Sequence, residues 1–244
     1  MRKLRAALCA LVWACAVGAQ AKVLLEETFE SYALGSPIAG QGGWVTLSID
    51  LAIVSPVPAL SGQGFASAGA QVEVMNEIGG QFDNKVSMQF DVFFPSGTSG
   101  RNLASAGLFS TSPAGGMSPV GWHAYRNAAG EDGWWLSSGN HFVAGGYDKP
   151  VSFRVTFDHP LQQVSGAYNF GNGWVNMPIY QTQMENVWGV YVSSRVDGFQ
   201  ADNILVTTTV PEPNTYALML LGLLALAARH QNRSRSCENH WSST

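Results

Sequence analysis

The chain has 244 residues, of which 46% are hydrophobic, 12% charged and 11% aromatic, and its formal net charge is −4. An average soluble domain is about 25% charged, so this composition excludes a highly charged disordered protein and a coiled coil rich in Glu, Lys and Leu. The acidic balance argues against a nucleic-acid partner, because proteins that bind nucleic acid normally carry a basic patch.

The first segment in chain order has the three parts of a secretory signal peptide. Basic residues precede an apolar run at 6–17, and Ala19 and Ala21 fit the A-x-A cleavage pattern. The apolar run is shorter than the roughly 20 residues that a membrane-spanning helix needs. We therefore assign residues 1–21 to a signal peptide and expect cleavage after Ala21.

Residues 22–209 are dominated by the two-residue alternation of β-strands. The alternation of apolar and polar residues is strongest at 85–95 and 151–158, as is typical of half-buried strands. Weaker strand patterns lie at 23–29, 44–54, 71–78, 106–110, 121–127, 134–138, 163–170, 174–180, 187–193 and 203–208. Turn residues separate these segments, and no helical periodicity precedes residue 216. The sequence therefore predicts an all-β fold, a β-sandwich that occupies residues 22–209.

The part of the chain between the two terminal segments is strongly acidic and contains no cysteine. Residues 22–210 have seven basic and fifteen acidic side chains, a net charge of −8, and all three cysteines lie outside them. No disulfide can therefore form within this region. A domain of this size buries roughly 70% of the surface of its unfolded chain, so a hydrophobic core suffices to hold it.

The acidic side chains do not follow the pattern of a glycoside hydrolase of this architecture. Such enzymes present carboxylates from alternate residues of one strand, as in E-x-D-x-E, and no such triplet occurs. Glu73 and Glu77 are four residues apart, about 13 Å along a strand, whereas glycoside hydrolysis needs carboxyl groups about 5–9.5 Å apart. A serine nucleophile motif and a regular spacing of metal-ligating histidines are also missing from the sequence. We therefore expect a protein that is not an enzyme.

Three aromatic residues are the candidate platform for a sugar. Aromatic rings stack on the apolar faces of pyranose rings, and a few polar groups then fix the orientation. We expect Trp122 and Tyr125, together with Trp135, to form such a platform. The alternative is that the tryptophans fill the core, where Trp is usually found.

The last segment has three parts in a fixed order. Pro211, Glu212 and Pro213 form an extended stretch, because proline fixes φ and lacks an N–H donor. The apolar residues 216–228 are rich in good helix formers but short for a permanent membrane span. A basic cluster follows them, and it consists of Arg229, Arg233 and Arg235.

Residues 210–235 resemble the PEP-CTERM sorting signal of Gram-negative bacteria. The resemblance implies recognition and cleavage by an exosortase-like protease, with transient anchoring in the inner membrane through the helix 216–228. It also implies export to the cell surface or to an extracellular matrix. The tail at 236–244 departs from the usual pattern, which stops soon after the basic cluster. The alternative is an ordinary C-terminal membrane anchor.

The two ends of the β region resemble those of concanavalin A-like and laminin-G-like jelly rolls. The resemblance rests on residues 27–44, with the pattern ETFESY…G…GGW, and on FQADNILV at 199–206. It implies a jelly roll with its first and last strands side by side, and a carbohydrate-binding role that many relatives share. Some laminin-G-like domains also hold a structural calcium ion. The oxygen ligands expected for it here are those of Glu27, Glu30, Asp202 and Asn203.

Together these observations predict an exported, non-catalytic protein of the cell surface or extracellular matrix that binds exopolysaccharide. Two alternatives remain open at the level of sequence. One is a secreted glycan-active enzyme of jelly-roll type, and the other is a purely structural or protein-binding module.

Overall fold

The computed structural model describes residues 20–48, 52–67, 71–78, 84–96, 103–111, 117–127, 129–137, 141–210 and 222. Ala19, the proline motif and the arginine cluster lie outside the described residues, and of the predicted apolar helix only Gly222 is described, in helical conformation. Lys22–Thr208 form one compact unit. In the described part of the chain, no helix is long and apolar enough to cross a bilayer.

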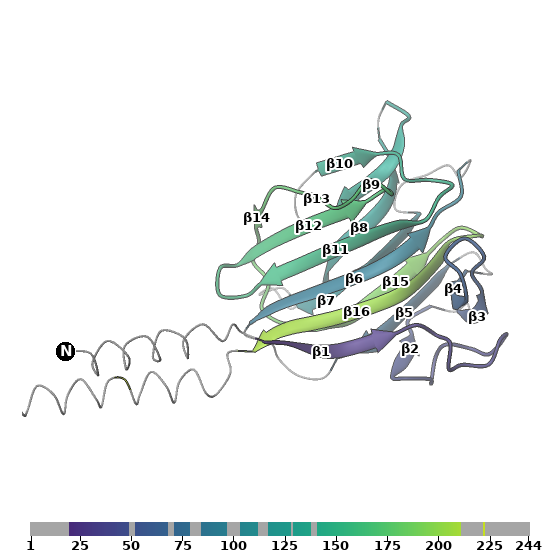
Figure 1. Ribbon diagram of the computed structural model, residues 1–244, viewed down its shortest axis with the longest axis horizontal. Helices are drawn as coiled ribbons and strands as arrows, with labels where there is room; N and C mark the ends of the chain where they lie inside the picture. The colour runs from purple at the N-terminus through teal and green to yellow at the C-terminus, as the bar shows by residue number, and fades with distance from the viewer. Residues whose placement is uncertain are drawn as a thin grey trace, which may run out of the picture. The chain divides into compact units, whose positions relative to one another are not determined.

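The compact unit is a sandwich of two sheets, one of nine strands and one of seven (Figure 1). The larger sheet consists of β1 (Gln20–Glu27), β3 (Ile53–Pro56), β4 (Gln63–Ala66), β6 (Lys85–Phe93), β11 (Val151–Asp158), β12 (Gln163–Asn169), β13 (Val175–Asn176), β14 (Tyr180–Gln181) and β16 (Gln200–Val210). Its order is β13-β12-β11-β6-β16-β4-β3, with β1 paired to β16 and β14 paired to β12.

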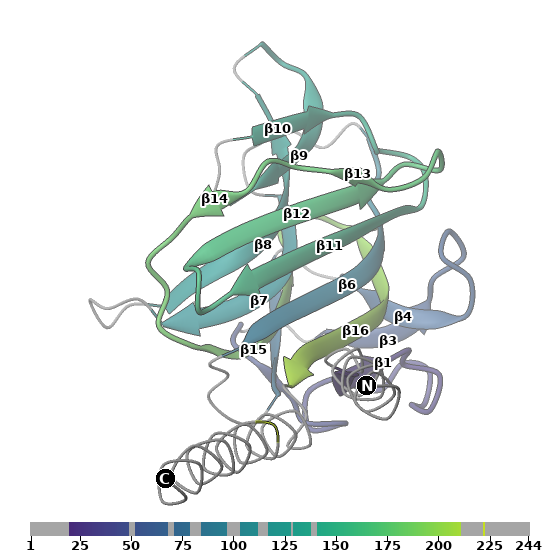
Figure 2. The same ribbon diagram turned by 60° about the vertical axis from the view of Figure 1, so that its left-hand side comes forward.

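The smaller sheet has the order β10-β9-β8-β7-β15-β5-β2. Its strands are β2 (Trp44–Thr46), β5 (Val72–Glu77), β7 (Ala104–Thr111), β8 (Met117–Arg126), β9 (Asp132–Leu136), β10 (His141–Ala144) and β15 (Val187–Ser194). Figure 2 shows this sheet lying behind β12, β11, β6 and β16 of the larger one. The all-β sandwich predicted from the sequence is confirmed.

The strand predictions differ from the structure in four places. The segment 44–54 was expected as one strand, but it contributes β2 to the smaller sheet and β3 to the larger one. The segment 174–180 likewise divides into the two short strands β13 and β14. β4 and β10 were not predicted, because four residues are too few to establish an alternating pattern.

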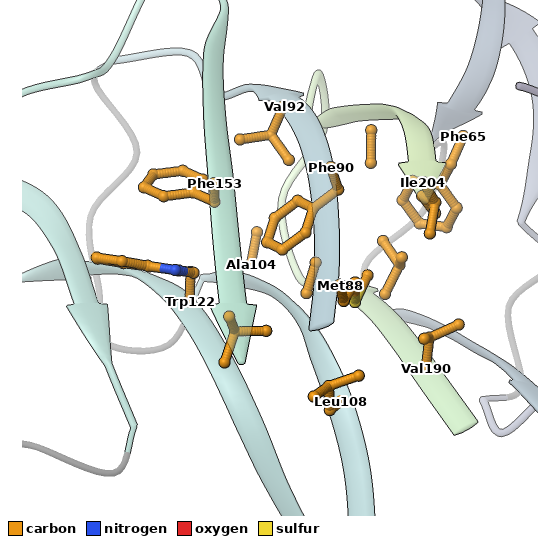
Figure 3. Packing of buried hydrophobic residues seen from close by; sticks show 14 of the residues in the cluster. Phe65, Met88, Phe90, Val92, Ala104, Leu108, Trp122, Phe153, Val190 and Ile204 are labelled. Atoms are coloured by element: carbon orange, nitrogen blue, oxygen red, sulfur yellow. The ribbon is translucent and has the colours of Figure 1, made fainter. Parts of the chain in front are cut away.

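The core lies between the inner faces of the two sheets (Figure 3). β6 and β11 pair in register, so their apolar residues form a continuous inner surface on the larger sheet. Trp122 on β8 stacks on Phe153 of β11 with ring centroids 4.6 Å apart. The indole N–H of Trp122 also donates to the carbonyl oxygen of Arg154 at 3.1 Å. This side chain therefore ties the two sheets together by both packing and a hydrogen bond.

The two ends of the compact unit lie side by side. β1 pairs with β16, and the start of β1 lies beside the end of β16 (Figure 1). This confirms the neighbouring first and last strands that the jelly-roll resemblance implied. Ala21, the expected cleavage position, is an exposed residue of β1. The sorting motif Pro211–Pro213 begins directly after Val210, the last residue of β16.

Candidate functional site

The outer face of the seven-stranded sheet carries one row of side chains that crosses six strands. Following the register from β5 through β15, β7, β8 and β9 to β10, the row contains Glu73, Ser193, Ser105, His123, Trp135 and Phe142. Directly paired residues point to the same face of a sheet, and strands lie about 4.8 Å apart. The row is therefore about 24 Å long, and we call it the cross-strand row.

One end of the cross-strand row is aromatic. Trp135 lies between His123, at 5.4 Å between ring centroids, and Tyr125, at 6.4 Å. Tyr125 in turn meets Phe142 edge-on at 6.3 Å. Tyr125, Trp135 and Phe142 are all partly exposed, and we call them the aromatic cluster. Their rings present a surface that is apolar yet accessible to a ligand.

A small polar pocket lies along the other part of the same row, from Glu73 to His123. Its volume is about 170 Å³, and its lining residues are Gln71, Val72, Glu73, Ser105, His123, Ser193, Ser194 and Arg195. The hydroxyl oxygens of Ser105 and Ser193 are 2.8 Å apart and share a hydrogen bond. These two residues lie 88 positions apart in the chain and are brought together by the pairing of β7 with β15.

His123 separates the polar pocket from the aromatic cluster. Its side chain is only 8% exposed, and neither ring nitrogen has a hydrogen-bond partner among the described residues. Burial lowers the pKa of His123 to about 4, so the imidazole is neutral at pH 7. A neutral imidazole offers one N–H donor and one nitrogen acceptor. His123 lines the pocket, and neither its donor nor its acceptor nitrogen has a protein partner among the described residues.

The predicted aromatic platform is partly wrong. Trp122 is 0% exposed and faces the core, whereas Tyr125 and Trp135 lie on the outer face. The reason is the period of two in a strand, which sends residues three positions apart to opposite faces. Trp134 and Trp135 also face opposite ways, with Trp134 in the core, as adjacent residues of a strand must.

Sequence reasoning missed half of the cross-strand row. Ser105, Phe142 and Ser193 were not identified, because they come from three strands whose pairing register no local pattern specifies. The one available signal was the spacing within β8. Since Trp122 and His123 are adjacent, an inward Trp122 requires His123 to point outward.

The expected calcium ligands do not converge on one ion. Both carboxylate oxygens of Glu27 are occupied by protein donors: the backbone N–H of Phe29 at 2.6 Å, the hydroxyl of Tyr32 at 2.5 Å and the indole N–H of Trp44 at 3.0 Å. The Glu30 carboxylate accepts a hydrogen bond from the backbone N–H of Gln63 at 2.7 Å.

Asp202 and Asn203, the other two expected calcium ligands, are also arranged differently from the prediction. The amide of Asn203 donates to Asp91 at 2.9 Å. Asp202 is buried, and one of its carboxylate oxygens has no partner in the described part of the chain. Among the described residues, no three His, Cys, Asp or Glu side chains are placed to hold a metal. The predicted calcium site at Glu27, Glu30, Asp202 and Asn203 is therefore not formed.

Asp202 makes the stability of the fold dependent on pH. Burial and, to a lesser extent, the negative charges of Glu30, Asp91 and Glu27 raise its pKa to about 7, against the Asn203 N–H that lowers it. An unfolded Asp has a pKa of about 3.9. Folding therefore costs no ionisation energy at Asp202 below about pH 4. The cost grows between pH 4 and pH 7 and is fully present above pH 7.

Replacing Asp202 with asparagine is expected to stabilise the protein at pH 8 by about 2–4 kcal/mol and to have little effect near pH 4. Urea denaturation at the two pH values measures this difference. Asp197→Asn, at an exposed position, is the matched control and should change stability little at either pH. A D202N variant no more stable than the parent at pH 8 would contradict the assignment.

Comparisons with known proteins identify the C-terminal segment. Residues 209–233 match the PEP-CTERM protein-sorting motif, which confirms the resemblance seen in the sequence. This motif implies processing by an exosortase. No curated protein matches the chain.

Several solved structures resemble the sandwich. A carbohydrate esterase of the Shiga toxin-encoding bacteriophage phi24B is 12% identical, with a TM-score of 0.49, over 79% of this chain and 100% of its own. The catalytic domain of a glycoside hydrolase family 131 protein from Coprinopsis cinerea is 11% identical, with a TM-score of 0.47, over 79% and 99%. Basic winged bean lectin with Tn-antigen is 9% identical, with a TM-score of 0.47, over 79% and 100%. At these values the likenesses indicate no ligand and no reaction for this chain.

Proposed function

We propose that this chain is an exported, non-catalytic protein of the cell surface or extracellular matrix whose β-sandwich binds exopolysaccharide. The sorting motif at 209–233 supports the first part, because proteins with this motif are exported and sorted to the cell surface. In this proposal residues 216–228 anchor the precursor transiently in the inner membrane of a Gram-negative bacterium. An exosortase then processes the precursor near Pro211–Pro213.

The single observation that supports polysaccharide binding is the aromatic cluster beside the polar pocket. Tyr125, Trp135 and Phe142 give partly exposed rings on which pyranose faces can stack, and the pocket supplies hydroxyl and imidazole groups next to them. A ligand site of this kind is mostly apolar, with a few placed polar groups. The length of the cross-strand row, about 24 Å, suits a polymer that spans several strands.

The placement of carboxylates favours binding over hydrolysis. Glu73 and Glu77 both point outward from β5, since they pair with Ser193 and Gly189 of β15. Their separation along the strand, about 13 Å, exceeds the 5–9.5 Å at which two carboxyl groups cooperate in glycoside cleavage. The proposal is therefore of a binding protein. Turnover of a polysaccharide that is lost on Glu73→Gln would instead support a glycan-active enzyme.

Replacing Trp135 with alanine is expected to weaken polysaccharide binding at least tenfold. The change removes the central ring of the aromatic cluster, and such aromatic anchors typically contribute the largest share of binding energy. Affinity electrophoresis or titration calorimetry of the processed protein against a panel of bacterial exopolysaccharides measures the effect. Trp188→Ala is the control, because Trp188 is 45% exposed on β15 but lies outside the cross-strand row.

The proposal predicts that W135A weakens polysaccharide binding and that W188A does not. Equal affinities for the parent and the W135A variant would exclude the aromatic cluster as the site. Absence of binding to every member of the panel would leave the structural or protein-binding module as the better description of the sandwich.

A further inference from the structure

We infer that the polar pocket binds the hydroxyl groups of one uncharged pyranose residue, while the next residue of the same glycan stacks on Trp135. This inference rests on the proposed function and specifies its ligand class. The sandwich would select neutral hexose polymers and discriminate against uronate-rich ones. The glycan would run along the cross-strand row, perpendicular to the strands.

The strongest support is the unpaired imidazole of His123. More than nine-tenths of this side chain is buried, it lines the pocket, and its two nitrogens have no partner among the described residues. Leaving a buried donor or acceptor unsatisfied costs about 1–3 kcal/mol, so such groups in native proteins usually have a function or an ordered partner. A sugar hydroxyl both donates and accepts, so it can pair with either nitrogen of a neutral imidazole.

The side-chain hydroxyls of Ser105 and Ser193, which lie opposite His123, can also form hydrogen bonds with a sugar. Ser105 pairs with His123 across β7 and β8, and it shares a hydrogen bond with Ser193. Each serine hydroxyl can rotate to donate or accept, so the pair can exchange its mutual hydrogen bond for bonds to a ligand. The part of the pocket lined by Ser105, Ser193 and His123 is thus polar but uncharged. Its volume of about 170 Å³ is below the 300–1,000 Å³ typical of drug-sized ligands and suits part of a single sugar.

The position of Trp135 indicates how a polymer would extend from the pocket. Trp135 pairs directly with His123, so one strand spacing, about 4.8 Å, separates the pocket from the stacking surface. Beyond Trp135 the row continues to Phe142 on the edge strand β10. A glycan that follows the row therefore contacts the polar groups of the pocket with one sugar and stacks on Trp135 with the next. This requires at least two linked sugars.

The net charge of the domain argues against an anionic sugar. In the pocket lining, Glu73 would repel a uronate carboxylate, and the exposed Arg195 would attract one. The net charge of −8 on residues 22–210 adds a repulsion that an anionic polymer must overcome. A neutral polymer is repelled neither by Glu73 nor by the net negative charge of the domain.

The test compares neutral polymers with their own oxidised forms. Soluble glucan, galactan and mannan, each before and after oxidation of C6 to the uronate, are titrated against the processed protein. We expect at least one neutral polymer to bind at least tenfold more tightly than its oxidised form at 0.15 M salt. Equal or tighter binding of the oxidised forms would overturn the inference.

Variants of the pocket separate this inference from the proposed function. His123→Phe keeps a ring against Trp135 but removes both polar atoms, and we expect it to lose at least tenfold in affinity. His123→Gln restores a donor and an acceptor and should recover part of the loss, while Ser105→Ala should weaken binding with a smaller disturbance of the fold. Thermal melting checks that each variant is folded.

The outcomes of these variants are distinct. If Trp135→Ala loses binding while His123→Phe and Ser105→Ala keep it, the pocket inference fails and the proposed function stands. If no polymer binds in either form, both fail.

Discussion

Replacement of Pro211, Glu212 and Pro213 by alanine is expected to abolish exosortase processing, so that the full-length precursor accumulates. The three residues lie in the segment that matches the PEP-CTERM sorting motif, directly after the last residue of β16. Because proline fixes φ and lacks an N–H donor, we expect the two prolines to favour the extended chain that a protease cleft requires, whereas alanine favours a helix continuous with the apolar residues that follow. Immunoblots of cell fractions from an exosortase-bearing host measure the size and location of the product.

The matched control changes three residues beyond the motif. Alanines at Cys237, Glu238 and Asn239 lie outside the matched residues 209–233 and should leave processing unchanged. Unaltered size and export of the proline-motif variant, in a host where the parent chain is processed, would refute the sorting assignment. The parent chain in a host that lacks exosortase should resemble the proline-motif variant.

Replacement of Trp122 by alanine is expected to destabilise the sandwich by about 3–5 kcal/mol, a large part of the total for a domain of this size. The change removes a fully buried indole that stacks on Phe153, and it leaves the carbonyl of Arg154 without its hydrogen-bond donor. The neighbouring side chains are held by two sheets and can close only part of the cavity.

Urea denaturation followed by tryptophan fluorescence measures this loss. Trp188→Ala is the matched control, since Trp188 is 45% exposed and outside the core, and it should cost about 1 kcal/mol or less. A Trp122→Ala variant with nearly the stability of the parent would show that the indole does not link the sheets as described. The contrast also separates the core role of Trp122 from the surface role proposed for Trp135.

The sequence predicted strands well wherever a strand is long and has one face in the core. β6 and β11 alternate over eight or nine residues, and their predicted ranges agree closely with the structure. The sheet to which a strand belongs was not predictable. β2 and β3 follow each other after a short connection, yet they lie in different sheets. The alternation of apolar and polar residues is the same in both sheets, so it does not tell which sheet a strand joins.

The residues of the candidate site were likewise predictable where they stand out within one strand, but not where only strand pairing brings them together. Tyr125 and Trp135 were identified because aromatic residues are conspicuous in a single strand. Ser105 and Ser193 contribute to the site only because β7 and β15 pair in one particular register. Trp122 was wrongly included since its neighbours in sequence were treated as neighbours on a surface, although a strand alternates its faces.

The calcium prediction failed for a different reason. The resemblance to laminin-G-like ends supplied acidic residues at the right strands, but not their hydrogen-bond partners. Glu27 receives donors from Phe29, Tyr32 and Trp44, so its carboxylate is used within the fold. Only the positions of those donors, one of them 17 residues away, distinguish a structural carboxylate from a metal ligand.

The placement of β16 has a mechanical consequence. A load applied through the segment after Val210 and directed along β16 would act on a strand that lies between β6 and β4 and also pairs with β1. Hydrogen bonds in an antiparallel ladder are perpendicular to the strands, so such a pull shears many of them together, whereas an edge strand peeled from its end loses them one at a time. A domain tethered at this end and gripping a polymer on its other sheet would therefore resist tension far better than one tethered through an edge strand such as β10.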